Sequence, residues 1–204
     1  MFYEPSKGHG LPHDPFKAII APRPVGWIST IDKDGAINLA PYSYFNALSA
    51  KPPLVWFSSD GEKHSATAAA ETGEFVTNLV SRMLAEKMNT TSVNAPRGIN
   101  EFDYAGLEMA PSRLVKPPRV AEAPASLECK VTDVYRPRGL DGSATDAFVV
   151  IGEVVGVYID EAYVHDGLFD SVMAGNVARL GYFDYSSTDR VFPMHRPRWD
   201  ADKI

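Results

Sequence analysis

The 204-residue sequence contains a single cysteine, Cys129, and this scarcity excludes several kinds of protein. One cysteine allows no disulfide within the chain and no cysteine-based zinc or iron–sulfur centre. Because residues 127–131 alternate apolar and polar positions as a strand does, we expect Cys129 to be a buried structural thiol. The N-terminus has no basic segment followed by an apolar run, and no apolar stretch approaches the length of a membrane span. We therefore expect a cytoplasmic protein with no membrane partner.

An excess of positive charge is also missing. The formal net charge is −6, which argues against nucleic acid as the main partner. With 45% hydrophobic and 23% charged residues, the composition is that of an ordinary globular protein. No internal repeat or linker divides the chain, so we predict a single domain over residues 1–204, with the proline-rich residues 1–24 as an N-terminal arm.

Several catalytic motifs are absent as well. The sequence has no G-x-S-x-G nucleophile elbow, no G-x-x-x-x-G-K-[ST] phosphate loop and no H-E-x-x-H zinc helix. No G-x-G-x-x-G follows a predicted strand, so a nicotinamide cofactor would have to bind without a Rossmann unit. His9 and His13 lie four residues apart in the arm, but two histidines alone do not lead us to predict a metal site. We predict no catalytic residue in the usual sense.

What the sequence does contain is many short strands separated by turn signals. The strands are predicted at residues 25–31, 36–40, 54–57, 74–80, 126–135 and 148–159. One alanine-rich helix is predicted from Ser65 to Thr72, with Gly73 as its C-terminal stop. Gly152 and Gly156 interrupt the last strand and predict bulges in a sheet that curls on itself. This pattern favours a mainly β barrel with a few short helices.

The segment 38–46 suggests a platform for a flat ring. We expect the chain to leave the strand pattern at Pro41 and to present aromatic rings and small polar groups in succession. Such groups suit a planar ligand with hydrogen-bonding edges. The residues are Tyr42, Ser43, Tyr44, Phe45 and Asn46. Packing of the same rings in the barrel core is an equally good interpretation.

The segment 58–65 suggests an anion site. Ser58, Ser59, Lys63 and Ser65 lie at the start of the predicted helix. Hydroxyl groups, a cation and the N–H groups of a helix start together bind phosphate well. The serines could also be plain turn and cap residues. A ring platform beside an anion site predicts a phosphorylated planar cofactor.

The order of several short motifs resembles the flavin reductase-like, FMN-binding split-barrel family. They are R-P-V-G-W-I-S-T at 23–30, N-x-A-P-Y-S-x-F-N at 38–46, P-P at 52–53, K-x-S at 63–65, E-T-G-E-F-V-x-N-L at 71–79 and G-E-V-V at 152–155. The closing A-R-L-G-Y-F-D-Y at 178–185 is similar to the version in the flavoredoxin-like branch. The resemblance runs from about residue 22 to about residue 197.

This resemblance implies a six-stranded split β-barrel and a homodimer with one FMN per subunit near the dimer interface. It also implies hydride transfer from NADH or NADPH to flavin, often to supply a partner monooxygenase. The sequence does not indicate which nicotinamide nucleotide is preferred. Two alternatives stay open: a non-enzymatic carrier that holds FMN and exchanges electrons with proteins, and a ligand-binding barrel that has lost flavin.

The resemblance also assigns roles to individual residues. The segment along the isoalloxazine ring and ribityl chain matches Ser43, Tyr44, Phe45 and Asn46, and the phosphate cradle matches Ser58, Ser59, Lys63 and Ser65. Asn78 matches a position beside the flavin. The C-terminal segment that closes over the site, which a second subunit could contribute, matches Arg179, Tyr182 and Tyr185. His64 replaces the aspartate common in the family, and it could add a donor to the phosphate. As isolated residues, Asn78 could be a polar strand position and Arg179 a surface cation.

Overall fold

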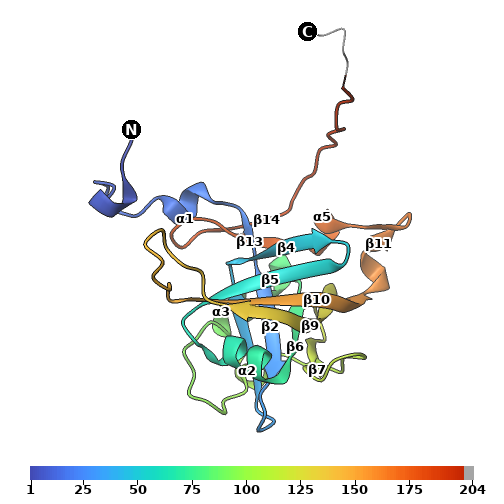
Figure 1. Cartoon of the computed structure of the whole chain (residues 1–204). Helices are drawn as coiled ribbons and strands as arrows, with labels where there is room; N and C mark the ends of the chain where they lie inside the picture. Colours follow the sequence, from blue (N-terminus) through green and yellow to red (C-terminus); the bar gives the residue numbers. More distant parts are fainter. Residues whose placement is uncertain (200–204) are drawn as a thin grey trace.

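The computed structural model describes residues 1–199, and one curled antiparallel sheet dominates it (Figure 1). The strands in spatial order are β3 (Ile37–Tyr42), β2 (Gly26–Ile31), β6 (Glu74–Asn78), β9 (Ala125–Tyr135), β10 (Ala147–Ile159), β5 (Pro53–Asp60) and β4 (Phe45–Ala50). The predicted mainly β architecture is confirmed. The sheet has seven strands and not six, because residues 45–50 form a strand that the sequence analysis did not predict.

Short elements surround this sheet. Three small sheets are formed by β1 (Arg23–Pro24) with β13 (Val177–Arg179) and β14 (Tyr185–Ser187), by β7 (Met109–Ala110) with β8 (Arg119–Val120), and by β11 (Val164–His165) with β12 (Leu168–Phe169). The α-helices are α1 (Phe16–Ile19), α2 (His64–Thr72), α3 (Ala85–Thr90), α4 (Glu101–Tyr104) and α5 (Ser171–Ala174). Single 3-10 turns occur at η1 (Pro5–Lys7), η2 (Arg82–Leu84) and η3 (Glu161–Tyr163). Among the described residues, no helix has the length and apolar character needed to cross a membrane.

The end of β3 differs from the expectation. We expected the chain to leave the strand at Pro41, but β3 continues through Tyr42, and Pro41 pairs with Trp27 on β2. A proline cannot donate to a strand ladder, but β3 is an edge strand with a neighbour on one side only. The predicted ring platform is consequently divided between β3, the two linking residues Ser43 and Tyr44, and β4.

The curl of the sheet depends on β10 and its glycines. The pairing of β10 with β9 shifts register between Ile151 and Gly152, and again between Val154 and Gly156. A Cβ atom at Gly152 would lie 2.5 Å from Cε1 of Phe75, so no larger residue fits without moving the ring. The predicted bulges are confirmed.

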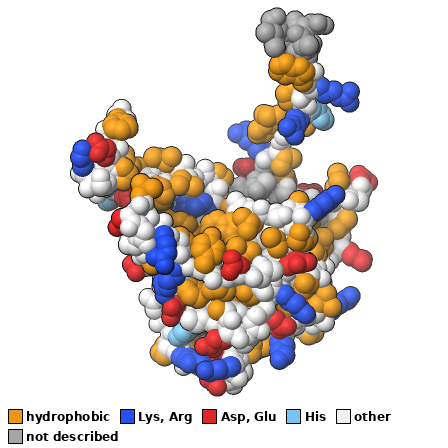
Figure 2. Space-filling view, viewed as in Figure 1, with side chains coloured by type: hydrophobic (Ala, Val, Ile, Leu, Met, Phe, Trp, Pro, Cys, Tyr) orange, Lys and Arg blue, Asp and Glu red, His pale blue; other side chains and the backbone are white. Residues whose placement is uncertain are grey.

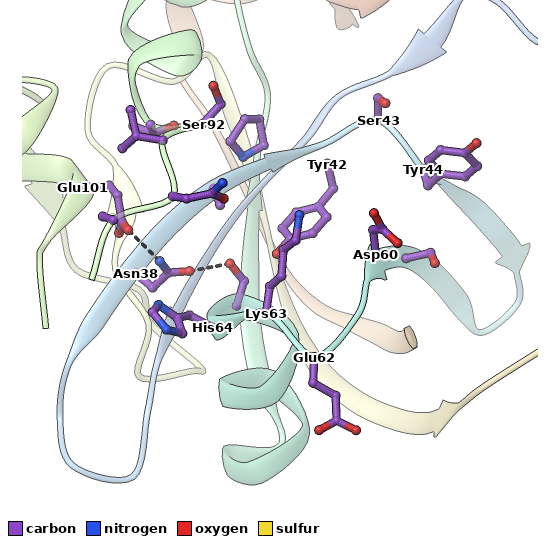
Figure 3. A pocket seen from close by; sticks show the side chains of 18 of the residues that line it. Asn38, Tyr42, Ser43, Tyr44, Asp60, Glu62, Lys63, His64, Ser92 and Glu101 are labelled. Carbon is purple, nitrogen blue, oxygen red and sulfur yellow. Dashed lines mark hydrogen bonds between the residues drawn. The ribbon is translucent and has the colours of Figure 1, made fainter. Parts of the chain in front are cut away.

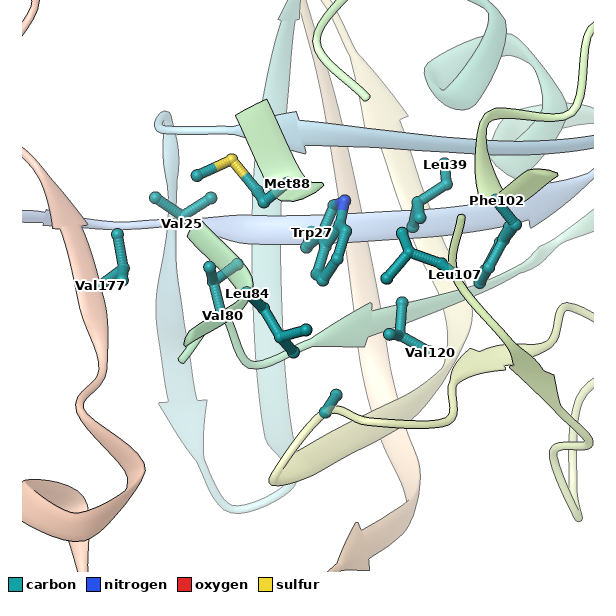
Figure 4. Close-up of a cluster of buried hydrophobic side chains, with 11 residues drawn as sticks. Val25, Trp27, Leu39, Val80, Leu84, Met88, Phe102, Leu107, Val120 and Val177 are labelled. Atoms are coloured by element: carbon teal, nitrogen blue, oxygen red, sulfur yellow. The ribbon is translucent and has the colours of Figure 1, made fainter. Parts of the chain in front are cut away.

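The strand β2 separates two hydrophobic clusters, because adjacent residues of a strand point to opposite faces. Trp27 lies in the first cluster with side chains of β3, α3, α4, β8 and β13 (Figure 4). Ile28 lies in the second cluster, where Phe57, Phe75 and α2 fill the curl. Cys129 belongs to this second cluster, and its burial raises the pKa of the thiol. The expectation of a buried structural cysteine is confirmed.

The helix α2 forms as predicted. Gly73 ends it in the left-handed conformation, with φ of 74°, and donates its N–H to the Ala69 carbonyl at 2.9 Å. Ala66 and Ala69 are buried against the second cluster. Their small side chains let the helix approach the sheet closely, and this seating directs the N-terminal end of α2 toward the ends of β3 and β5.

Candidate cofactor site

A cavity of about 470 Å³ lies at the N-terminal end of α2, bordered by the ends of β3 and β5 and by residues 91–95 (Figure 3). Its size is within the range of small-molecule and cofactor sites. Six of the predicted site residues line it: Ser43, Tyr44, Ser58, Lys63, His64 and Ser65. The structure therefore brings together parts of both predicted segments, the ring platform and the anion site.

The start of α2 is open to a ligand. The first N–H groups of any α-helix have no partner within the helix, and no side chain in the described part of the chain caps this one. Lys63 occupies the N-cap position, and His64, the first helical residue, also faces the cavity. Without a capping carboxylate, the positive end of the helix dipole and the Lys63 ammonium group act in the same place.

The floor of the cavity is held by a buried polar network. Glu101, 3% exposed, accepts hydrogen bonds from Asn38 Nδ2 at 2.9 Å and from the Leu39 N–H at 3.0 Å. The Oδ1 atom of Asn38 accepts a hydrogen bond from the Ser65 hydroxyl (Figure 3). These bonds join α4, β3 and α2, so the helix start is fixed relative to the strand.

Tyr42 completes the lining beside this network. Its ring lies 5.0 Å from that of Phe57, centre to centre. Burial raises the pKa of the Tyr42 hydroxyl, and the neighbouring Ser65 hydroxyl opposes part of that rise. The phenol therefore stays protonated at neutral pH and can act as a hydrogen-bond donor.

Among the described residues, some charged side chains around the cavity have protein partners, and others do not. Glu62 is paired with Arg136 at 2.6 Å, and Glu101 is bound as described above. Within residues 1–199, neither Lys17 nor Lys63 has a carboxylate within ion-pair distance. Asp60 also lines the cavity without an ion pair in this part of the chain. Two lysines that line one cavity without an ion pair in the described chain favour the binding of an anionic ligand.

Three predicted residues on β4 and β5 do not line the cavity. Phe45 packs against the second cluster and against Gly26, where an added Cβ would lie 2.6 Å from the Phe45 ring. Asn46 is exposed, and its Oδ1 accepts only the N–H of Ala47. Ser59 is 1% exposed, and its hydroxyl has no hydrogen-bond partner among residues 1–199.

Asn78 lies in the interior of the sheet and does not line the cavity. Its Nδ2 donates to the Trp27 carbonyl at 3.0 Å. Its Oδ1 accepts from the Val120 N–H at 2.9 Å and from the Ser126 hydroxyl at 2.8 Å. These contacts join β6 to β2, β8 and β9, so Asn78 has a structural role.

The predicted C-terminal residues are also outside this cavity. The Arg179 guanidinium lies 4.4 Å from the centre of the Tyr185 ring and donates to the Tyr182 carbonyl. Arg179 and Tyr185 line a different cavity, next to α3. Tyr182 is exposed, with a positive φ of 55°, and its ring meets that of His13 edge to face. Within one chain, the predicted closing segment does not cover the cavity.

The sequence analysis missed several lining residues. Asn38 and Asp60 lie inside the two segments it singled out, so a wider interpretation of those segments would have included them. Lys17, Glu101 and residues 91–95 come from regions without a motif. No local signal could have found them, since only the tertiary fold brings them to the cavity.

Comparisons with known proteins agree with this architecture. The sequence pattern described as flavin reductase like domain matches residues 20–176. An uncharacterised protein of Halalkalibacterium halodurans is 36% identical over 183 residues, which are 87% of either chain.

The crystal structure of nitrilotriacetate monooxygenase component B from Bacillus cereus is similar, with a TM-score of 0.84 and 28% identity. The match covers 95% of this chain and 98% of the other. Flavoredoxin of Desulfovibrio vulgaris has a TM-score of 0.72 at 21% identity, covering 89% and 93%. At that identity the likeness concerns the fold, and it supports the predicted split-barrel architecture.

Proposed function

The chain belongs to the flavin reductase-like family, and we propose that it is an FMN-binding NAD(P)H:flavin oxidoreductase with its cofactor in the cavity beside α2. The observation that carries this proposal is the uncapped start of α2, where Lys63 has no ion-pair partner among the described residues. A helix start and a free ammonium group beside a cavity suit a phosphate ester.

The residues present fit FMN. Ser58, Lys63, His64 and Ser65 would hold the phosphate, and for Ser59, which does not line the cavity, we propose a supporting role. Ser43 and Tyr44 would border the ring and ribityl chain, whose hydroxyl groups could donate to Asp60. For Phe45, Asn46 and Asn78 we propose supporting roles, because their contacts are with protein groups.

Bound FMN would supply the redox chemistry, accepting a hydride from NADH or NADPH. The protein's part is to bind and orient the reactants. The Tyr42 hydroxyl, kept protonated by burial, would donate a hydrogen bond within the site. Glu101 would hold Asn38, and through it Ser65, in the positions that shape the phosphate end.

We further propose a homodimer in which Arg179, Tyr182 and Tyr185 of one subunit close over the cavity of the other. In their own chain these residues do not line the cavity, although Tyr182 is 51% exposed. Hydrophobic side chains gather on the face formed by β4, β5 and β10 (Figure 2), where an apolar groove of about 340 Å³ includes Leu54 and Val157. An apolar face suits a two-fold interface. Sedimentation of a monomer at micromolar concentration, with FMN bound, would contradict the shared site.

The name of the similar Bacillus cereus structure suggests a partner. It is component B of a monooxygenase, so we propose that this protein supplies reduced flavin to a flavin-dependent monooxygenase in the cytoplasm.

The test is to titrate the purified protein with FMN and then to follow NADH and NADPH oxidation with FMN in excess. We expect FMN binding and steady-state turnover. Binding without turnover would favour the flavin electron carrier. A colourless protein that ignores added FMN would favour a barrel that has lost flavin and would overturn the proposal.

A further inference from the structure

The N-terminal arm brings a second cation to the cavity. Lys17, on α1, lines the cavity, and its ammonium group lies 6.0 Å from the centre of the Tyr44 ring. Figure 3 shows Tyr44 and Asn38 at different ends of the cavity, with Lys63 between them. Lys17 is therefore at the Tyr44 end, whereas Lys63 is at the helix start.

The arm is held in this position by buried contacts. Arg23 is 8% exposed, and its guanidinium donates to the carbonyls of Lys17 and Ile20 on the arm. It also donates to the Leu180 carbonyl of the C-terminal segment at 2.9 Å. An exposed lysine on an unattached arm would sample many positions. Two bonds from the buried Arg23 side chain hold the backbone that carries Lys17, and the third ties the same side chain to the C-terminal segment.

A close backbone contact fixes the same helix from the other side. A Cβ atom at Gly181 would collide with the Cβ of Ala18 and lie 2.7 Å from its Cα. The neighbour of Lys17 is thus seated directly on the glycine. Residues 17–20 of the arm therefore have a defined position beside the cavity.

We propose that Lys17 binds a phosphate group of the nicotinamide dinucleotide, while Lys63 binds the phosphate of FMN. This inference rests on the proposed function. FMN carries one phosphate, and Lys63 with the start of α2 already provides for it. A second unpaired cation at the other end of the cavity, on a separate exposed element, suits the anion that enters second.

The first test compares Lys17→Ala with Lys63→Ala in the full-length protein. The readouts are the Kd of FMN for the apoprotein, and the Kd of NAD⁺ and NADP⁺ for the FMN-loaded protein by calorimetry. Lys17→Ala should raise the dinucleotide Kd about three- to tenfold and change the FMN Kd less than about twofold. Lys63→Ala should show the reverse order of effects.

Two dinucleotides are used because the anion could be either of two groups. An equal loss for NAD⁺ and NADP⁺ identifies the pyrophosphate, which both contain. A loss for NADP⁺ alone identifies the 2′-phosphate. Lys7→Ala is the matched control, because Lys7 lies on the same arm and is paired with Glu4 at 2.8 Å on the surface. Its removal should leave all three constants unchanged.

A second variant tests the contact between Gly181 and Ala18 without removing a charge. Gly181→Ala should displace α1 and so raise the dinucleotide Kd as Lys17→Ala does. In the double variant the two effects should not add, because both act through the position of Lys17. A fall in melting temperature without a change in dinucleotide affinity would assign the contact to stability alone.

Three results would overturn the inference. If Lys17→Ala weakens FMN and leaves both dinucleotides unchanged, Lys17 belongs to the FMN phosphate. If it changes neither ligand, the lysine is a solvated surface charge. In either case a wild-type protein that oxidises NAD(P)H leaves the proposed function standing. A wild-type protein that binds FMN but no dinucleotide overturns both.

Discussion

Two polar regions of this protein have opposite surroundings. The first, which we call the Asn78 junction, consists of Asn78 and its partners Trp27, Val120 and Ser126. There the side-chain amide atoms of Asn78 are hydrogen-bonded to protein groups in the interior of the sheet. The second, which we call the Lys63 rim, consists of Lys63, Lys17 and His64. Their side chains line the cavity and form no ion pair among residues 1–199. The family resemblance assigned Asn78, Lys63 and His64 alike to the flavin site.

The contrast separates polar groups that stabilise a fold from polar groups that are available to a ligand. Removing the hydrogen-bond partner of a buried polar group lowers the free energy of unfolding by about 1–3 kcal/mol, because no water replaces the lost bond. An exposed lysine contributes little to stability, since water already solvates it. Substitutions at the junction should therefore act on unfolding, and substitutions at the rim should act on binding.

The largest effect is expected at the junction. Asn78→Ala removes three hydrogen bonds and leaves the Val120 N–H and the Trp27 carbonyl without their side-chain partner. The free energy of unfolding should fall by about 2–4 kcal/mol. Chemical denaturation followed by tryptophan fluorescence measures it.

Asn46→Ala is the matched control, since that asparagine is exposed and bonds only to the adjacent backbone. It should change the unfolding free energy by less than about 0.5 kcal/mol. A stable Asn78→Ala protein with weakened FMN binding would reverse this assignment and return Asn78 to the flavin site.

The next effect is expected at the rim. Lys63→Ala should weaken FMN binding by about 1.5–3 kcal/mol, the range for a hydrogen bond to a charged group, or roughly ten- to a hundredfold. Riboflavin affinity and melting temperature should hardly change, because riboflavin has no phosphate and the lysine has no protein ion pair in the described chain. Titration of both ligands into both proteins measures this.

Equal losses for FMN and riboflavin, together with a lower melting temperature, would make Lys63 a structural residue. Unchanged FMN affinity would remove Lys63 from the phosphate site. Either outcome would erase the difference between the rim and the junction.

The smallest effect concerns the ion pair between Arg97 and Asp32, whose side chains are 58% and 12% exposed. Arg97 donates to Asp32 Oδ2 at 2.8 Å and, with the backbone N–H of Ala36, lowers the pKa of that carboxyl. The folded pKa lies below the unfolded one, so Asp32 stabilises the fold above the unfolded pKa, near 3.8. This contribution is lost as the pH falls through the folded pKa.

Unfolding measured between about pH 5 and pH 2.5 tests the sign. Arg97→Ala should reduce the loss of stability in that window. Arg138→Ala, whose guanidinium donates to the Gly142 carbonyl, should leave the pH dependence as it is. A steeper loss after removal of Arg97 would show that the sign is wrong.

Local patterns were enough to predict much of this fold. The helix α2 and its Gly73 stop depend on neighbouring residues, and so do the glycine bulges of β10. Pro41 was misjudged because its tolerance in β3 depends on the absence of a second neighbouring strand, which is a property of the whole sheet.

The candidate site was predictable only in part, because contacts distant in sequence complete it. Ser58 and Ser59 are adjacent on β5, and alternation sends only one of them to the cavity. Which one faces the cavity depends on the strand's register with β4 and β10. Asn78 was assigned to flavin by the family resemblance. Its contacts with Val120 and Ser126 could not be predicted, because those residues lie more than forty positions away in the sequence.

The bonds of Arg23 also have a consequence for biosynthesis. The guanidinium reaches a carbonyl 157 residues further along the chain, so it cannot close this contact until Leu180 has been translated. Domains generally begin to fold from the N-terminus as they are made. Here the arm around Lys17 is translated well before Leu180, so it acquires its full anchorage only after the chain has grown 157 residues beyond Arg23.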